Sequence, residues 1–122
     1  MTFKEINKLL HNCYICILSI INGEEPYMVP MYYEYNNESN EPKFILESKN
    51  SGQKINCLKA NHKVCLYIQY NDDGCFKTVV IGGKASLKKI SNSASYPDLS
   101  RIIINVEEMS GRIYHKERRL ID

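Results

Sequence analysis

The sequence predicts a small antiparallel β-barrel with two short helices. Three observations favour this class: the strand-like segments are short and closely spaced, hairpin turns are indicated at Asn22-Gly23 and at residues 71–74, and a strand-to-helix crossover occurs once. A doubly wound parallel sheet would instead need a helix after almost every strand. We count six strands.

Length and composition place limits on the fold and on function. The chain has 122 residues, of which 43% are hydrophobic and 25% are charged, so we expect one domain spanning residues 1–122. The formal net charge of +2 is too small to indicate nucleic-acid binding. No apolar run approaches the roughly 18 residues of a membrane helix, and no signal-peptide core is present. We therefore expect a cytoplasmic protein without membrane contact.

The cysteines do not indicate a disulfide framework or a metal site. There are five of them, and Cys13, Cys16, Cys57 and Cys65 lie in apolar or amphipathic segments, which favours reduced, mostly buried thiols. Residues three apart in a strand point to opposite faces, so Cys13 and Cys16 should not form a dithiol. The spacing of Cys57, His62 and Cys65 does not fit a zinc site, and we expect no metal.

The first element is expected to be a helix. Thr2 and Glu5 form a capping-box pattern, and the helix should end near His11 or Asn12. Its apolar face is expected to comprise Phe3, Ile6, Leu9 and Leu10.

Two strands follow. Residues 13–21 form an apolar, β-branched run that ends at the Asn22-Gly23 turn, and residues 25–37 return antiparallel. Tyr27, Val29, Met31, Tyr33 and Tyr35 should share one face, and Met28, Pro30, Tyr32 and Glu34 the other. Because proline cannot donate to a ladder, Pro30 marks an edge, a bulge or a place that a ligand covers.

The remaining strands are expected at residues 43–48, 64–70, 75–87 and 101–109. A short helix over residues 53–61 lies between the first two of them, with Ile55, Cys57 and Leu58 on its apolar face. Residues 91–100 indicate a loop, and residues 111–122 a basic tail without periodicity.

The best candidate site in the sequence is the segment Ser48–Lys54, where a strand leads into a helix. Ser51 can act as the N-cap, Gly52 allows close approach of the backbone, and Lys54 adds a positive charge beside the free amides of the first turn. These features outline a phosphate anchor. The alternative is that Ser51 only caps the helix and the lysines are solvated. A Walker motif is absent, so a P-loop hydrolase is not expected.

Other chemistry has little support, and we assign no catalytic residue. His11, His62 and His115 are scattered and have no neighbouring nucleophile motif, and no carboxylate pair stands out. The basic tail is either a solvated end or a contact to phosphate or RNA. Its charged residues are Arg112, His115, Lys116, Arg118 and Arg119.

Taken in order, four blocks of the chain resemble the pyridoxamine 5'-phosphate oxidase-related family, including its 5-nitroimidazole-resistance subgroup. The blocks are E-P-Y-M-V-P-M-Y-Y (25–33), S-K-N-S-G-Q-K-I-N-C-L-K-A-N-H-K-V-C (48–65), T-V-V-I-G-G-K-A (78–85) and V-E-E-M-S-G-R (106–112). The family typically carries G-x-P-x-x-x-P followed by aromatics in the first block, whereas Gly23 and Pro26 are three apart here.

The resemblance implies a Greek-key split barrel that works as a homodimer and holds FMN at the subunit interface. The phosphate is expected near Ser48, Gln53 and Lys54, and the ring beside the strand that contains Pro30. The cofactor-binding residues implied are Val29, Pro30, Met31, Tyr32, Glu47, Ser48, Lys49, Gly52, Gln53, Lys54, Tyr67 and Thr78.

The implied function is an FMN-dependent oxidoreductase that passes electrons from a reduced nicotinamide or similar donor to a small-molecule substrate. Two features depart from the family pattern: Glu47 stands where the nitroimidazole-resistance subgroup usually has histidine, and the loop after Leu87 is short. One alternative is a non-catalytic module that binds flavin or haem on the same barrel. A second is a small RNA- or protein-binding barrel that uses the basic tail.

Overall fold

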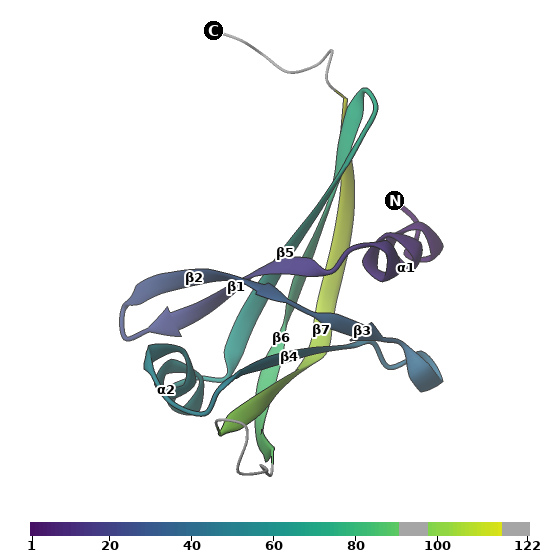
Figure 1. The fold of residues 1–122 in the computed structure, drawn as a ribbon. Coiled ribbons are helices and arrows are strands. Elements are labelled where there is room, and N and C mark those ends of the chain that lie inside the picture. The colour runs from purple at the N-terminus through teal and green to yellow at the C-terminus, as the bar shows by residue number, and fades with distance from the viewer. Residues whose placement is uncertain (91–97, 116–122) are drawn as a thin grey trace, which may run out of the picture.

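The computed structural model describes residues 1–90 and 98–115. Its elements in chain order are α1 (Phe3–Asn12), β1 (Ile15–Asn22), β2 (Glu25–Tyr32), β3 (Glu34–Asn36), the 3₁₀ turn η1 (Glu38–Asn40), β4 (Lys43–Lys49), α2 (Gln53–Ala60), β5 (Lys63–Asp72), β6 (Cys75–Ile90) and β7 (Leu99–His115). The strands form one sheet of order β2-β1-β5-β6-β7-β4-β3 (Figure 1). Every neighbouring pair is antiparallel. The predicted mainly-β split barrel is confirmed, with seven strands rather than six.

The additional strand arises because the predicted strand over residues 25–37 is interrupted at Tyr33. β2 pairs with β1 at one edge of the sheet, and β3 pairs with β4 at the other. At the junction, the Tyr33 backbone N–H donates a 3.0 Å hydrogen bond to the Tyr14 carbonyl. The chain therefore crosses directly from one sheet edge to the other, which brings the two edges together as a barrel.

The predicted alternation along this segment is confirmed. Tyr33 and Tyr35 are each only 8% exposed, whereas Met28, Pro30 and Tyr32 are exposed. Pro30 pairs with Ile17 of β1 on one side only, because β2 is an edge strand. The absence of an N–H on Pro30 thus costs the sheet no ladder bond.

Both helices contribute apolar side chains to the core. The Thr2–Glu5 capping box is present, and Ile6, Leu9 and Leu10 are buried as predicted. The prediction for Phe3 is wrong, since its side chain is 53% exposed. From α2, the core receives the predicted apolar face, namely Ile55, Cys57 and Leu58.

The last strand is longer than predicted. β7 continues to His115 because its register partners run along β6 as far as Cys75, so residues 111–115 are strand and not tail. Together with the end of β5, these strands project beyond the barrel and pass beside α1 (Figure 1). Gly111 permits this approach, since a Cβ there would lie 2.9 Å from Ile6 Cγ1. Most of the predicted loop (91–97) and the final residues 116–122 lie outside the described residues.

All five cysteines are free thiols. Cys16 and Cys57 are buried, and the other three are partly buried. Cys13 is the C-cap of α1 and not the start of β1, which begins at Ile15. No helix in the described part of the chain is long and apolar enough to cross a membrane.

Candidate functional site

A surface cavity of about 540 Å³ lies where the two edges of the sheet meet. β2 and the junction after it contribute one wall, and β4 and the first turn of α2 contribute the other. Its lining residues are Pro30, Met31, Tyr32, Tyr33, Glu34, Ile45, Glu47 and Lys54. The volume lies within the range of about 300–1,000 Å³ that is typical of small-molecule sites.

The positive end of this cavity is the first turn of α2. The Lys54 ammonium lies 3.2 Å from the Ser48 hydroxyl oxygen at the end of β4. The first helical hydrogen bond runs from Asn56 N–H to the Gly52 carbonyl. The amide groups of residues 53–55 therefore have no acceptor within the helix and, with Lys54, favour an anion.

The predicted cap at Ser51 is wrong. The N-cap is Gly52, which has φ 104° and makes no side-chain cap. A Cβ on Gly52 would meet nothing within 4 Å, so the backbone here borders open space. Glycine is needed for its positive φ, and the first turn of α2 is left without a side-chain acceptor.

A carboxylate also borders the cavity. Glu47 Oε1 lies 3.5 Å from Arg101 Nη2 of the adjacent strand β7, and both side chains are about half exposed. Arg101 Nε is buried without a hydrogen-bond partner in the described part of the chain. The guanidinium partly offsets the repulsion that Glu47 would exert on an anion held by Lys54.

Tyr33 forms a neutral, fixed part of the wall. Its hydroxyl donates a 2.7 Å hydrogen bond to the Leu10 carbonyl, and burial raises the pKa of the phenol well above its ordinary value. The side chain therefore remains protonated throughout the neutral range. Tyr32 next to it is exposed and stacks on Tyr14, with ring centroids 6.1 Å apart.

The structure brings together part of the predicted site. Five predicted residues line the cavity, namely Pro30, Met31, Tyr32, Glu47 and Lys54. Ser48 contacts Lys54, and Gly52 and Gln53 begin α2 beside it. Val29, in contrast, packs against the core, and Lys49 borders a separate small pocket with Asn50 and Ser51.

Tyr67 and Thr78 lie apart from this group. They border a hollow of about 410 Å³ on the outward face of β5, β6 and β7, which does not share a lining residue with the first cavity. Within one copy of the chain, the predicted site is therefore divided between two surfaces.

Sequence reasoning missed four residues of the site. Tyr33 and Glu34 border the cavity because the strand breaks there, and Ile45 borders it two residues before Glu47 on the same face of β4. The period-2 alternation of β4 could have indicated Ile45. Arg101 had no sequence signal, because its contact with Glu47 depends on the pairing of β4 with β7.

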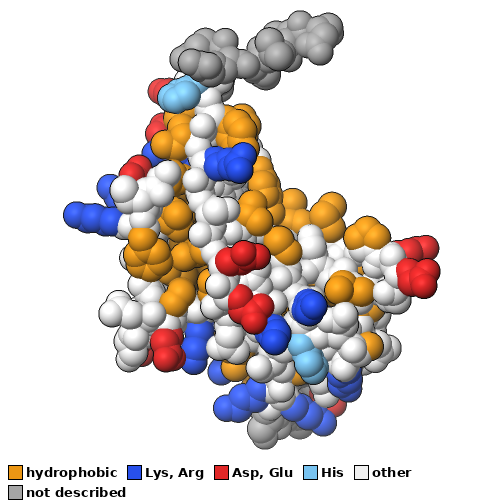
Figure 2. Space-filling model, turned by 180° about the vertical axis from the view of Figure 1, so that it is seen from behind, with side chains coloured by type: hydrophobic (Ala, Val, Ile, Leu, Met, Phe, Trp, Pro, Cys, Tyr) orange, Lys and Arg blue, Asp and Glu red, His pale blue; other side chains and the backbone are white. Residues whose placement is uncertain are grey.

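The outward faces of β1, β2, β6 and β7 carry a set of exposed apolar side chains. They are Ile15, Ile21, Met28, Tyr32, Val80 and Tyr114, and their exposed fractions range from 36% to 72%. Figure 2 shows hydrophobic side chains gathered along the projecting strands and along the β1–β2 edge. Contiguous apolar surface of this kind is typical of an interaction face.

The residues that the structure describes include no group of three or more His, Cys, Asp or Glu side chains able to hold a metal ion.

No protein-family model matches the sequence, and a comparison with curated proteins finds no match. Solved structures do match. A FAD-binding protein from Mesorhizobium loti has a TM-score of 0.78 at 22% identity, covering 93% of this chain and 95% of that one.

Two further structures match over most of both chains. A Listeria innocua protein provisionally named pyridoxamine 5'-phosphate oxidase has a TM-score of 0.74 at 19% identity, covering 88% of this chain and 94% of that one. A Bacteroides thetaiotaomicron protein provisionally named as a 5-nitroimidazole antibiotic resistance protein has a TM-score of 0.71 at 19% identity, covering 93% and 84%. The predicted resemblance is confirmed at the level of the fold: this chain has the split-barrel fold of the pyridoxamine 5'-phosphate oxidase-like proteins.

Proposed function

We propose that this protein binds FMN in the cavity between β2 and β4, as a homodimer, and uses it as an oxidoreductase. The observation that carries the proposal is the position of Lys54 in the first turn of α2, where it borders the cavity while its ammonium contacts Ser48 at the end of β4. The neighbouring structures are named as FAD-binding and pyridoxamine 5'-phosphate oxidase-like proteins, which supports a flavin as the ligand.

The residues present fit the phosphate of FMN. Lys54 supplies a full positive charge, and the amides of residues 53–55 have no acceptor in the helix. The Ser48 hydroxyl donates to the Lys49 carbonyl and accepts from Lys54, so it holds the lysine in place. Gly52 has open space beside its Cα, so the phosphate can approach the backbone. The single cluster of anion-binding groups at one end of the cavity suits the terminal phosphate of FMN.

The rest of the cavity fits a planar ring. Pro30 lies on an edge strand, so the outer side of β2 has no strand paired to it and its backbone groups are available to the polar edge of the ring. Tyr32 and Met31 supply polarisable surface, and Ile45 supplies an apolar contact on the opposite wall.

A second copy of the chain would complete the site. The exposed apolar side chains lie on the same outward faces as the hollow that contains Tyr67 and Thr78. If two copies pair through this surface, Tyr67 and Thr78 of one copy can face the cavity of the other. This arrangement accounts for the division of the predicted residues between two surfaces.

When bound, FMN supplies the transfer of a hydride or of single electrons between a reduced nicotinamide and a small acceptor. The residues of this chain hold and orient it. Lys54 and the helix amides would neutralise the phosphate, β2 would position the ring, and the neutral Tyr33 phenol adds no negative charge to the wall. Glu34 and Glu47 also line the cavity and would disfavour strongly anionic acceptors.

The cofactor proposal is tested by fluorescence titration with FMN. Lys54→Met removes the charge and should weaken binding about tenfold or more, because a charge-assisted contact to phosphate is lost. The matched control is Lys59→Met, an exposed lysine in the last turn of the same helix, which should leave affinity unchanged. Equal affinity of all three proteins would refute the phosphate site.

The dimer is tested by sedimentation. Met28→Glu places a charge on the apolar face, and it should both separate the copies and weaken FMN binding. The control Lys4→Glu alters an exposed residue of α1 and should change neither. A wild-type protein that remains monomeric with saturating FMN would contradict the proposal.

The oxidoreductase activity is tested by anaerobic reduction of the FMN-loaded dimer with NADH or NADPH, followed by addition of a quinone or nitro compound. Bleaching and recovery of the flavin absorbance are expected. Tight FMN binding without reduction by either donor would favour a non-catalytic flavin-binding module.

A further inference from the structure

One edge of the projecting strands has no partner strand. β4 pairs with β7 only as far as Asn105, whereas β7 continues beside β6 to His115. Within the described part of the chain, no backbone hydrogen bond outside the β6 ladder reaches residues 106–115. Alternate N–H and C=O groups of this segment therefore point away from the sheet, where another strand can pair with them.

The two strands at the ends of the sheet are protected against such pairing, but this part of β7 is not. β2 carries Pro26 and Pro30, which have no N–H to offer, and β3 is only 3 residues long. Residues 106–115 include neither proline nor lysine, the two residues that most commonly protect an exposed edge. The length and composition of this segment favour pairing with a further strand.

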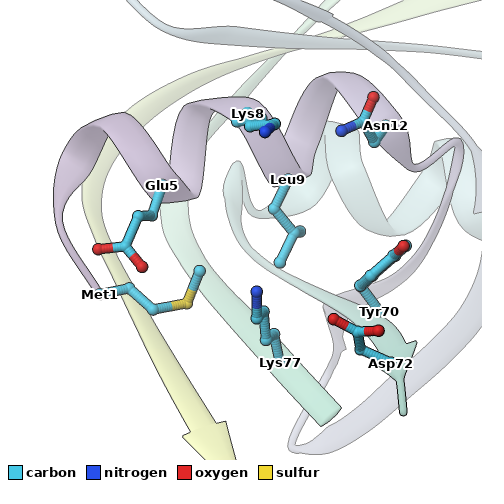
Figure 3. A pocket seen from close by; sticks show the side chains of 8 residues that line it. All are labelled: Met1, Glu5, Lys8, Leu9, Asn12, Tyr70, Asp72 and Lys77. Carbon is cyan, nitrogen blue, oxygen red and sulfur yellow. The ribbon is translucent and has the colours of Figure 1, made fainter. Parts of the chain in front are cut away.

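The N-terminal end of α1 covers the inward face of this segment. Figure 3 shows the helix crossing above β6, with Met1 and Glu5 on the side nearest β7 and Tyr70 on the opposite side. Gly111 of β7 lies beneath this end of the helix, where a Cβ would be 2.9 Å from Met1 Sδ and from Ile6 Cγ1. A further strand would therefore meet β7 along its edge and not on its inward face.

Two opposite charges lie on the outward face of this segment. Glu108 pairs with Gly82 in the ladder and its side chain lies over that residue, with Cγ 3.2 Å from where a Cβ would be. Arg112 borders the outward hollow together with Thr78 and Val80. Among residues 1–90 and 98–115, neither side chain has an oppositely charged group within 4.0 Å. Four residues of strand separate the two by about 13 Å, so they cannot neutralise one another within one copy.

The spacing of these charges makes the strand complementary to a second copy of itself. When two antiparallel copies of β7 pair about an axis at Ser110, Glu108 of each copy stands directly opposite Arg112 of the partner subunit, on the same face. Side chains at such positions have Cβ atoms about 4.5–5.5 Å apart, and opposite charges there stabilise a sheet. Centring the pair on Met109 or on Gly111 would lose both ion pairs.

We propose that the open edge of β7, over residues 108–112, pairs antiparallel with the same edge of a second copy through two reciprocal Glu108–Arg112 ion pairs. The projecting strands of the two copies then form one continuous sheet. On the inward side, Met109 of the partner subunit lies opposite Gly111, below the end of α1 that carries the 53% exposed Phe3. This contact uses the edge of the sheet, whereas the proposed flavin dimer uses the outward faces, and it does not depend on flavin binding.

The association is tested by sedimentation of the full chain at increasing concentration. Such short paired strands bury less surface than a stable dimer does, so we expect a Kd of about 0.1 mM. The mean mass should therefore rise nearly twofold between about 10 µM and about 1 mM. Met28→Glu, which separates the flavin dimer, should show the same rise from monomer to dimer, so failure here is distinguished from failure of the flavin proposal. A mass that stays constant in both proteins overturns the edge pairing.

Charge reversals test the register. Glu108→Arg and Arg112→Glu each place two pairs of like charges opposite one another, and each should weaken the association about tenfold. An equimolar mixture of these two variants should associate as the wild type does, because every Arg then faces a Glu. The controls Glu24→Arg and Lys59→Glu reverse exposed charges elsewhere and should have no effect. Unchanged association in either single variant, or no recovery in the mixture, overturns the proposed pairing.

Hydrogen exchange assigns the contact to the edge of β7. Backbone amides within residues 108–112 that do not bond to β6 should exchange more slowly at the high concentration than at the low one, because they donate to the partner strand. The Arg112→Glu variant should lose this difference. Protection that increases with concentration only outside residues 108–112 would mean that the copies associate through another surface, and it would overturn the proposal.

Discussion

The hydroxyl of Tyr33 donates a 2.7 Å hydrogen bond to the carbonyl oxygen of Leu10, twenty-three residues earlier in the chain. Leu10 lies in the last turn of α1, where carbonyl groups have no partner within the helix. Tyr33 lies where the chain crosses from β2 to β3, and its backbone N–H bonds to Tyr14. One residue therefore satisfies the end of α1, interrupts the strand and forms part of the candidate cavity wall.

The first prediction concerns this bond. Tyr33→Phe should lower the free energy of unfolding by about 1–2 kcal/mol, because the buried Leu10 carbonyl loses its donor. The control is Tyr35→Phe, since the Tyr35 hydroxyl is buried without a hydrogen-bond partner among the described residues and its removal should cost almost nothing. Urea denaturation compares the two. An equal loss of unfolding free energy in both variants would show that the hydrogen bond from Tyr33 to Leu10 does not stabilise the fold.

Local chemistry accounts for the parts of the fold that the sequence predicts well. The Thr2–Glu5 box starts α1 from residues three apart, and Gly23 has φ 66° in the predicted hairpin turn. Pro30 indicated an edge, a bulge or a place that a ligand covers, and the structure places it on an edge strand. The sequence could also indicate that Lys54 and Ser48 lie close together, because both residues belong to one short strand–loop–helix segment.

The features that sequence reasoning missed depend on distant partners. The break at Tyr33 is determined by Tyr14 and Leu10, and nothing within residues 25–37 specifies it. Residues 111–115 have no clear periodicity, yet they are strand because β6 offers them a ladder. Arg101 reaches Glu47 only through the β4–β7 register. The intrinsic β-propensity of a segment predicts its structure poorly where pairing with a distant strand decides whether it becomes a strand.

The second prediction concerns Glu47 and follows from the proposed FMN site. Glu47→Gln should change the free energy of unfolding by less than about 0.5 kcal/mol, because a half-exposed ion pair with Arg101 contributes little. It should, however, tighten FMN binding roughly two- to fivefold, since a negative charge is removed from a cavity that holds a phosphate. Glu24→Gln, in the β1–β2 turn, is the control for net charge. Weaker FMN binding in Glu47→Gln would contradict this electrostatic argument.

The third prediction concerns alkaline pH. Burial raises the pKa of the Cys16 thiol from 9.0 to about 12, and burial also raises that of Tyr33. A group with a raised folded pKa holds its proton longer in the native state than in the unfolded chain. Its stabilisation is complete below the unfolded pKa and is lost as pH rises through the folded value.

The free energy of unfolding should therefore fall between about pH 9 and pH 12, by up to about 1.4 kcal/mol per pH unit for each such group. Cys16→Ala should flatten the first part of this decline, although the small cavity lowers its stability at neutral pH. Urea denaturation under reducing conditions at several pH values measures both slopes. Parallel curves for the wild type and the variant would indicate that Cys16 does not titrate with unfolding.

The fourth prediction uses two adjacent glycines at the β6–β7 bulge. The register between these strands shifts at Gly82 and Gly83, where Gly82 pairs with Glu108 and Gly83 with Val106. A Cβ on Gly83 would overlap the Asn105 carbonyl oxygen, a backbone atom that cannot move without disturbing the ladder. Gly83→Ala should therefore cost about 1–3 kcal/mol. A Cβ on Gly82 would meet only the flexible Glu108 side chain, with Cγ at 3.2 Å, so Gly82→Ala should cost much less. Urea denaturation of the two variants measures the effect. The difference between their unfolding midpoints separates the close backbone approach at Gly83 from the general effect of replacing glycine in a strand. Similar midpoints would mean that the bulge relaxes to admit a methyl group at either position.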